Sequence, residues 1–265
     1  MTVAASAVAA SPNAQAVVER LVAERPTFHS AGGEDRIWNA QPRTLELIAR
    51  LARPGWRTLE TGAGASTAVF TAAGARHVAI SPAADEHRRI RDWCERAGID
   101  CGAVEFVEGC SDDVLPALDP DELDMAFIDG GHSFPIPVID WHYVARRLRV
   151  GGILVLDDVP IPAVAVVFRA MLDDPGWVLL ELADQRAAAF RKTAEIPEGD
   201  IWRRQAFNRS FPDYSFAALS TRVRLQARHQ TREFRRDAAT RYPRLTRVYR
   251  LFKRQPRHPG RGSAA

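Results

Sequence analysis

The segment RTLETGAGAST, residues 57–67, has the pattern of a short β-strand, a glycine turn and the first turn of an α-helix. Gly62 and Gly64 lack a Cβ atom, so the backbone there can turn sharply and approach a ligand closely. The amide groups of the first helical turn then face that ligand. Glu60 places a carboxylate at the end of the strand, just before the glycines. This arrangement favours a ligand that carries a positive charge, such as an amino group.

Apolar runs alternate with helical patterns from this segment onward to residue 192. The expected strands are residues 57–61, 77–81, 104–107, 124–128, 153–156, 177–182 and 187–191. The expected helices are residues 13–23, 42–51, 66–73, 84–97, 113–118, 136–148, 163–172 and 220–239. Strands that alternate with helices imply crossover connections and a parallel sheet that is covered on both faces.

The last two expected strands are joined by only a few residues around Asp184 and Gln185, so they should pair antiparallel. The sequence therefore predicts a three-layer α/β fold, with helices on both faces of one sheet. Its sheet has seven strands, mostly parallel, and ends in an antiparallel C-terminal hairpin. The expected organisation is a helical or flexible extension at 1–40, this core domain at 41–195 and a basic extension at 196–265.

Acidic residues follow two further strands of the expected sheet. The strand at 124–128 leads into Asp129 and then His132, and the strand at 153–156 leads into Asp157 and Asp158. Because neighbouring strands lie about 4.8 Å apart, carboxylates at their ends converge on one small volume. Like charges so close are unfavourable unless a proton or a cation separates them. A hard divalent cation such as Mg²⁺, which binds oxygen ligands, is the simplest remedy.

Three patterns together resemble the class I S-adenosylmethionine-dependent methyltransferases. They are E-x-G-x-G-x-S from Glu60, I-D-G-x-H-S from Ile128 and G-G-x-x-x-x-D-D from Gly151. The second and third are similar to patterns of small-molecule O-methyltransferases, and the resemblance covers roughly residues 40–192. It implies the methyltransferase version of the Rossmann-like fold and the transfer of a methyl group from S-adenosylmethionine to a hydroxyl of a small molecule.

The resemblance also implies a set of cofactor-binding residues. Glu60 would face the amino group of the methionine part. Family members usually carry an acid after the second strand for the ribose hydroxyls, whereas this chain has Ser81 there, with Asp85 or Glu86 as substitutes. Ser111, after the third strand, is expected to contact the adenine. The full expected set is Glu60, Gly62, Gly64, Ser66, Thr67, Ser81, Ser111 and Asp129.

In catechol-type methyltransferases, two aspartates and an asparagine hold a metal that binds the substrate hydroxyls. The matching residues here are Asp129, Asp157 and Asp158, so an aspartate replaces the asparagine. His132 stands where those enzymes carry a lysine that takes the hydroxyl proton, and an imidazole suits a general base at neutral pH. We expect His132 and Asp129 to be catalytic. Two alternatives stay open: a salt-bridged acidic pair without metal, and a histidine that only hydrogen-bonds a loop carbonyl.

Charge is distributed unevenly along the chain. Residues 201–265 hold 17 Lys and Arg against 3 Asp and Glu, whereas the first 200 residues hold 19 basic and 30 acidic residues. The basic tail, with a second expected helix at 242–253, fits a solvated extension, a helix on an anionic membrane surface, or a segment that docks on an acidic protein surface. It lacks an RNA-binding or helix-turn-helix signature, which disfavours nucleic acid as a partner.

Apolar runs, the charge of the N-terminal residues and cysteine spacing argue against several other classes of protein. The chain has no apolar run near 18 residues, and its first 15 residues lack Lys and Arg, which argues against a membrane span and a signal peptide. The three cysteines, Cys94, Cys101 and Cys110, have no C-x-x-C spacing, which argues against a disulfide framework or a zinc site. A cytoplasmic location is expected.

Two other functions compete with catalysis of methyl transfer. The chain could bind S-adenosylmethionine without catalysis and be anchored through its basic tail. It could also be a nicotinamide-dependent Rossmann oxidoreductase, although it lacks both G-x-G-x-x-G and an acid after the second strand. The sequence identifies neither the methyl acceptor nor a homo-oligomer.

Overall fold

A computed structural model of the chain describes residues 12–31, 34–37, 39–118, 122–199, 205, 207–209, 214–215 and 217–241. The chain divides into two compact units, Met1–Phe207 and Asn208–Ala265. The expected helix at 242–253 lies outside the described residues. The domain boundaries expected after residues 40 and 195 stay a prediction.

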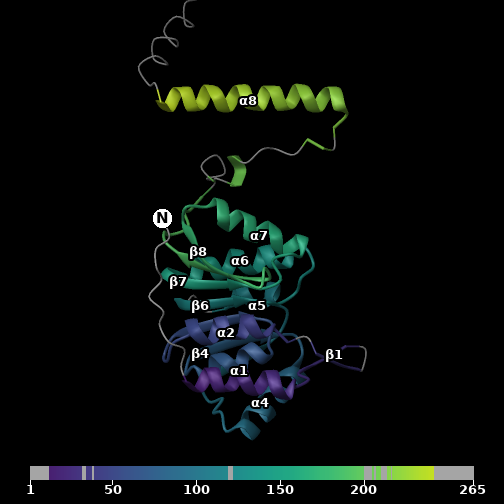
Figure 1. The fold of residues 1–265 in the computed structure, drawn as a ribbon, viewed down its shortest axis with the longest axis vertical. Coiled ribbons are helices and arrows are strands. Elements are labelled where there is room, and N and C mark those ends of the chain that lie inside the picture. Colours follow the sequence, from purple (N-terminus) through teal and green to yellow (C-terminus); the bar gives the residue numbers. More distant parts are fainter. Residues whose placement is uncertain are drawn as a thin grey trace, which may run out of the picture. The chain divides into compact units, whose positions relative to one another are not determined.

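The first unit is built on a seven-stranded sheet with the order β5-β4-β3-β6-β7-β9-β8 (Figure 1). The strands are β3 (Arg57–Thr61), β4 (Arg76–Ser81), β5 (Val104–Glu108), β6 (Leu123–Ile128), β7 (Leu148–Leu156), β8 (Trp177–Ala183) and β9 (Ala187–Lys192). The five strands from β5 to β7 pair parallel, whereas β9 pairs antiparallel with both β7 and β8. The predicted Rossmann-like α/β fold with an antiparallel C-terminal hairpin is thereby confirmed.

Two groups of helices cover the sheet, and alternate residues of each strand face one group or the other. On β6, Met125 and Phe127 belong to one hydrophobic core, and Ala126 and Ile128 belong to the second. Helices α1 to α4 pack on one another over the first core, and α5 to α7 do so over the second. These helices are α1 (Pro12–Glu24), α2 (Pro42–Leu51), α3 (Ala65–Ala72), α4 (Ala84–Ala97), α5 (Ser111–Ala117), α6 (Ile136–Arg147) and α7 (Pro162–Asp173).

A short hairpin was not expected from the sequence. Strands β1 (His29–Ala31) and β2 (Glu34–Arg36) pair antiparallel and extend away from the body of the first unit (Figure 1). Strands of three residues are too short to show a period-2 pattern. An ion pair of 2.6 Å between Arg89 of α4 and Asp35 fastens the hairpin to the unit.

Strand β7 begins earlier than expected. The glycine pair before Ile153 indicated a break between a helix and a strand, but α6 ends at Arg147 and β7 starts at Leu148. Gly151 has a φ of +88°, a left-handed conformation that glycine adopts readily. The pairing of β6 with β7 is irregular over this part, so the strand bulges there and continues.

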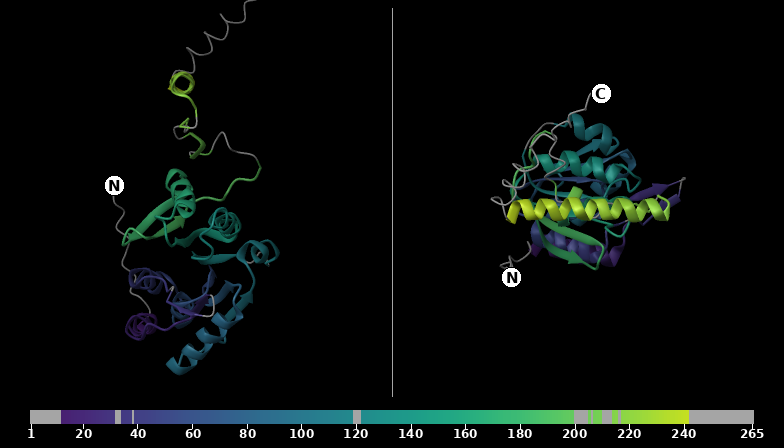
Figure 2. Two further views of the ribbon diagram at one scale, coloured as in Figure 1. Left: turned by 90° about the vertical axis from the view of Figure 1, so that its right-hand side faces the viewer. Right: turned by 90° about the horizontal axis from the view of Figure 1, so that it is seen from above.

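In the second unit, α8 (Leu219–Arg241) is one continuous helix (Figure 2), close to the predicted 220–239. Leu219, Val223 and Phe234 on this helix are all more than half exposed. Among the described helices, none combines the length and the apolar character that a transmembrane segment needs. What α8 contacts stays a prediction.

Candidate active site

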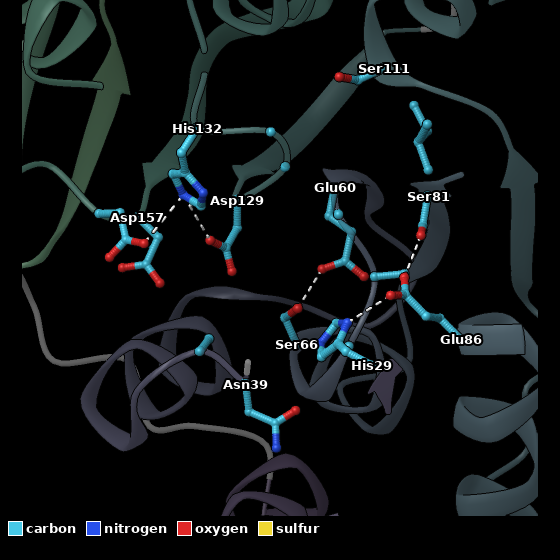
Figure 3. Close-up of a pocket in the computed structure, with 18 of the residues that line it drawn as sticks. His29, Asn39, Glu60, Ser66, Ser81, Glu86, Ser111, Asp129, His132 and Asp157 are labelled. Carbon is cyan, nitrogen blue, oxygen red and sulfur yellow. Dashed lines mark hydrogen bonds and ion pairs between the residues drawn. The ribbon is translucent and has the colours of Figure 1, made fainter. Parts of the chain in front are cut away.

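The site lies at one edge of the sheet, where the adjacent parallel strands β3, β6 and β7 end. In open α/β sheets, ligands bind beyond the carboxyl ends of the strands. A cavity of about 810 Å³ opens at this edge. Its wall includes Glu60 near the end of β3, Asp129 after β6 and Asp157 after β7 (Figure 3). The cavity is therefore large enough for a nucleotide-sized ligand and a small acceptor.

The glycine turn after β3 lines the cavity and needs glycine at its first position. Gly62 has a φ of +89°, and a Cβ atom there would stand 2.6 Å from the carbonyl oxygen of Asp129. Backbone strain and a steric clash therefore both exclude a side chain at Gly62. Gly64, which precedes α3, lies beneath His29 of the hairpin, whose Nε2 atom would be 3.1 Å from an added Cβ.

The carboxylate of Glu60 is held by the first turn of α3. Glu60 is 1% exposed, and Ser66 donates a 2.6 Å hydrogen bond to its Oε2 atom. Thr67 donates to Oε1 and accepts a 3.0 Å hydrogen bond from the amide of Gly64. Ser66 lines the cavity as expected, but Thr67 is buried and is turned inward to Glu60. Thr67 thus shapes the turn and holds Glu60.

The side chain of Glu86 joins Ser81 at the end of β4. The hydroxyl of Ser81 donates a 2.5 Å hydrogen bond to Glu86, and Nδ1 of His29 lies 3.0 Å from the same carboxylate. Burial tends to raise the pKa of Glu86, but the hydrogen bonds with His29 and Ser81 outweigh it and lower this pKa. All three residues line the cavity, whereas Asp85 forms an exposed pair with Arg88. Glu86 is therefore the acid that lies beside Ser81.

The start of α5 forms the next part of the wall. Ser111 is the first residue of this helix, is 9% exposed and lines the cavity together with Cys110 and Asp112. It follows β5, and its expected contact with adenine stays a prediction. No side chain caps the helix, so its first amide groups stay available near the cavity.

The other end of the cavity is acidic. Nε2 of His132 lies 3.3 Å from Oδ2 of Asp158 and 3.7 Å from Oδ1 of Asp129. Ligand atoms of these three residues all lie within 4.8 Å of one another, and Figure 3 shows His132 turned toward the carboxylates. Arg186, from the turn between β8 and β9, forms an ion pair with Asp158. Such a pair was one of the two alternatives left open for Asp158, and the charge of Arg186 also acts to lower the pKa values of Asp129 and Asp157.

Asp157 lines the same end of the cavity. It is 3% exposed, and its Oδ1 atom has no hydrogen-bond partner within the described part of the chain. Burial is the largest cause that raises the pKa of Asp157 to about 6, and the charge of Asp158 adds to it. Burial likewise raises the pKa of Asp129 well above its ordinary value, and the charge of Asp157 is the next cause. An unpartnered buried oxygen and two carboxyl groups with raised pKa values fit a site that takes up a proton or a cation.

The backbone conformation at Asp158 is unusual. Its φ of +55° lies in the left-handed region, which residues other than glycine seldom adopt. The conformation costs roughly 1–3 kcal/mol and persists only where the surroundings enforce it, often at functional sites. Its ion pair with Arg186 holds the strained residue in place.

Sequence reasoning missed several residues of the cavity wall, among them His29 and Arg186. His29 belongs to a three-residue strand, and Arg186 belongs to a hairpin turn, so neither lies in a motif with a chemical meaning. Glu86 had a usable signal, because a helix that follows a strand after two or three residues brings its first turn back to the end of that strand.

Comparisons with known proteins agree with this architecture. Residues 59–159 match the family described as a methyltransferase domain, a span that includes every predicted site residue. A search of curated proteins found no match. A solved structure from Corynebacterium glutamicum has the same fold, with a TM-score of 0.53 and 17% identity over 71% of this chain and 93% of that chain.

Two more solved structures are similar at lower TM-scores. The O-methyltransferase TomG from Streptomyces achromogenes, in complex with S-adenosylmethionine, has 19% identity and a TM-score of 0.49, covering 71% of this chain and 92% of that chain. The methyltransferase PaMTH1 from Podospora anserina, bound to S-adenosylhomocysteine, has 17% identity and a TM-score of 0.48, covering 70% and 90%.

Proposed function

We propose that this chain, whose residues 59–159 match the family described as a methyltransferase domain, transfers a methyl group from S-adenosylmethionine to a hydroxyl of a small molecule. One observation carries the proposal. A single cavity joins the Glu60, Ser81 and Glu86 side chains at one end to Asp129 and His132 at the other. Cofactor recognition and proton transfer could thus take place a short distance apart.

The cofactor would lie along the glycine turn. Glu60 would accept a hydrogen bond from the amino group of the methionine part, and the amide groups at the start of α3 would face the carboxylate of that part. Ser81 and Glu86 would bind the ribose hydroxyls, so that an acid from α4 serves in place of an acid at the strand end. Ser111 would contact the adenine. The cofactor itself supplies the reactive methyl group on its sulfonium sulfur.

The protein must hold the acceptor hydroxyl in line with that methyl group. Such orientation accounts for roughly 7–11 kcal/mol of barrier reduction. His132 would accept the hydroxyl proton, and the resulting imidazolium would lie between the carboxylates of Asp158 and Asp129. A base within hydrogen-bond reach of the reacting oxygen contributes about 10²–10⁴-fold to the rate.

The acidic end also fits a divalent cation. Three carboxylates line it, and one oxygen of Asp157 is buried without a partner in the described part of the chain. Asp129, Asp157 and Asp158 would hold the ion, whose oxygen ligands are those that Mg²⁺ prefers. A bound ion would lower the pKa of the acceptor hydroxyl and fix its direction. His132 is close enough to Asp129 and Asp158 to be a fourth ligand, and only a measurement of cation binding by a variant separates this role from that of a base.

Methyl transfer from radiolabelled S-adenosylmethionine to a panel of hydroxylated acceptors tests the proposal. We expect label in an O-methylated product with the wild-type chain, formed about 10²–10⁴-fold more slowly with His132→Ala. If the wild-type chain binds S-adenosylhomocysteine but labels no acceptor that a catechol methyltransferase accepts, a non-catalytic binding function replaces the proposal. If label appears on nitrogen or carbon instead, the hydroxyl acceptor is wrong.

A further inference from the structure

His77 contacts Glu60, a residue of the cavity wall, and has no part in the proposed reaction. It belongs to β4 and pairs in register with Thr58 of β3. Its side chain is 1% exposed and stacks on Phe70, with ring centroids 4.5 Å apart and an interplanar angle of 15°. A fully buried imidazole needs partners for both of its nitrogens.

Both partners are present. Nδ1 of His77 lies 2.8 Å from the hydroxyl of Thr58, and Nε2 lies 3.1 Å from Oε1 of Glu60. Glu60 Oε1 already accepts from Thr67, and Oε2 accepts from Ser66. Because both oxygens act as acceptors, Glu60 behaves as a carboxylate, and Nε2 must carry the proton that faces it. His77 is therefore a donor to Glu60 in either state of its other nitrogen.

The hydrogen bonds leave little free capacity at Glu60. A carboxylate offers about four acceptor directions. Two donors take Oε1, from Thr67 and His77, and Ser66 takes one direction of Oε2. One acceptor direction of Oε2 therefore remains free for a ligand at the cavity wall, beside the direction that Ser66 occupies. Glu60 can thus accept a single hydrogen bond from a ligand, in a fixed direction.

We propose that His77 is a positioning residue that holds Glu60 for the amino group of the amino-acid part of the cofactor. The inference rests on the proposed function, since it names the ligand group that Glu60 receives. His77 touches no ligand and acts through Glu60 alone. Its loss therefore affects ligands that carry the amino group and spares ligands that lack it.

Calorimetric titration of the full chain with two ligands tests this role. S-adenosylhomocysteine carries the amino group, whereas 5′-deoxy-5′-methylthioadenosine has the same nucleoside without the amino-acid part. We expect His77→Leu to bind S-adenosylhomocysteine at least about 10-fold more weakly, since a hydrogen bond to a charged group is removed. Its affinity for methylthioadenosine should stay within about 3-fold. His77→Gln, which keeps an N–H donor, should recover most of the lost affinity.

The control variant is Thr58→Val, which removes the hydroxyl behind the imidazole and leaves Glu60 untouched. Thr58→Val should weaken the binding of S-adenosylhomocysteine by a smaller factor than His77→Leu does. Circular dichroism and thermal unfolding establish that each variant is folded, and Thr58→Val carries the test if His77→Leu does not fold. An equal loss for both ligands, or no loss for either, would overturn the inference. If the wild-type chain binds neither ligand, the proposed function itself is refuted, and with it this role.

Discussion

Nε2 of His132 lies 3.3 Å from Oδ2 of Asp158, slightly longer than an ordinary hydrogen bond between nitrogen and oxygen. His132 comes from the loop after β6 and Asp158 from the loop after β7, so neighbouring parallel strands bring them together. The imidazole can act as a proton acceptor or share a cation with the carboxylate, and these two roles make different predictions.

Replacing His132 tests the role of base. We expect His132→Ala to lower the turnover number by about 10²–10⁴-fold, because the group that accepts the proton is removed. Binding of Mn²⁺, measured by calorimetry and electron paramagnetic resonance, should stay within about 3-fold of wild type. If His132→Ala loses cation binding together with turnover, His132 is a ligand and the role of base is wrong.

Replacing Asp157 tests the cation site. We expect Asp157→Ala to abolish turnover, because a buried ligand oxygen is lost from the acceptor end of the cavity. Affinity for S-adenosylhomocysteine should stay largely intact, because Asp157 lies after β7 whereas the glycine turn lies after β3. Unchanged turnover in Asp157→Ala, or in excess chelator, would rule out the metal mechanism.

The same residue makes stability depend on pH. The pKa of Asp157 is about 6 in the folded chain, above the ordinary value of an aspartate. A raised pKa means that the folded state binds the proton more tightly, so ionisation destabilises the fold as the pH rises from about 4 to above 6. In chelator, Asp157→Asn should therefore be more stable than wild type at pH 8 by about 2–3 kcal/mol. The difference should shrink at pH 4.

Urea unfolding at the two pH values measures both free energies. An Asp157→Asn variant that is no more stable than wild type at pH 8, or equally stabilised at both pH values, contradicts the assignment. Added Mg²⁺ should reverse the order at pH 8, because the cation stabilises the wild-type carboxylates and not the amide.

Variants of Glu86 and Asp85 form a matched pair that tests the ribose end of the cavity. Glu86→Ala should weaken S-adenosylhomocysteine by about 10-fold, since a charged hydrogen-bond acceptor at the cavity wall is lost. Asp85→Ala should change the affinity by less than about 2-fold, because Asp85 is exposed and pairs with Arg88. Calorimetric titration of both variants measures the two affinities. Equal losses of affinity would show that Glu86 is not part of the binding site.

Alanine substitutions at Gly62 and Gly98 distinguish the effect of a steric clash from that of backbone strain. Both have positive φ values, +89° and +72°, but an added Cβ meets the carbonyl of Asp129 at Gly62 and finds nothing within 4 Å at Gly98. Gly98→Ala should lower the free energy of unfolding by about 1 kcal/mol. Gly62→Ala should lower it by more and should also abolish binding of S-adenosylhomocysteine. Equal losses in the two variants would show that the close approach at Gly62 is unimportant.

Much of the fold could be predicted because its elements carry strong local signals. The expected bounds 57–61, 42–51 and 84–97 coincide with β3, α2 and α4. Each of these segments has a glycine or proline at its boundary, and the repeated alternation of strands and helices then implies the parallel sheet. The convergence of Asp129 and Asp158 could be predicted because the strands that precede them are neighbours in the sheet.

The remaining features depend on tertiary contacts that have no local pattern. The hairpin at 29–36 is held by Arg89 of α4, which lies at least 53 residues away in the sequence. Its two strands are also too short to show a period. Thr67 could face a ligand or the protein interior, and only the position of Glu60 relative to α3 turns it inward. The pairing of Arg186 with Asp158 depends on how the antiparallel hairpin seats β9 beside β7.

Calorimetric titration of the wild-type chain with S-adenosylhomocysteine, with NAD as the comparison, tests the central claim most directly. The arrangement of Glu60, the glycine turn and Glu86 predicts one S-adenosylhomocysteine bound per chain, no binding of NAD, and a loss of affinity of at least about 10-fold in Glu60→Ala. Binding of NAD in place of S-adenosylhomocysteine, or binding of neither, would contradict the account.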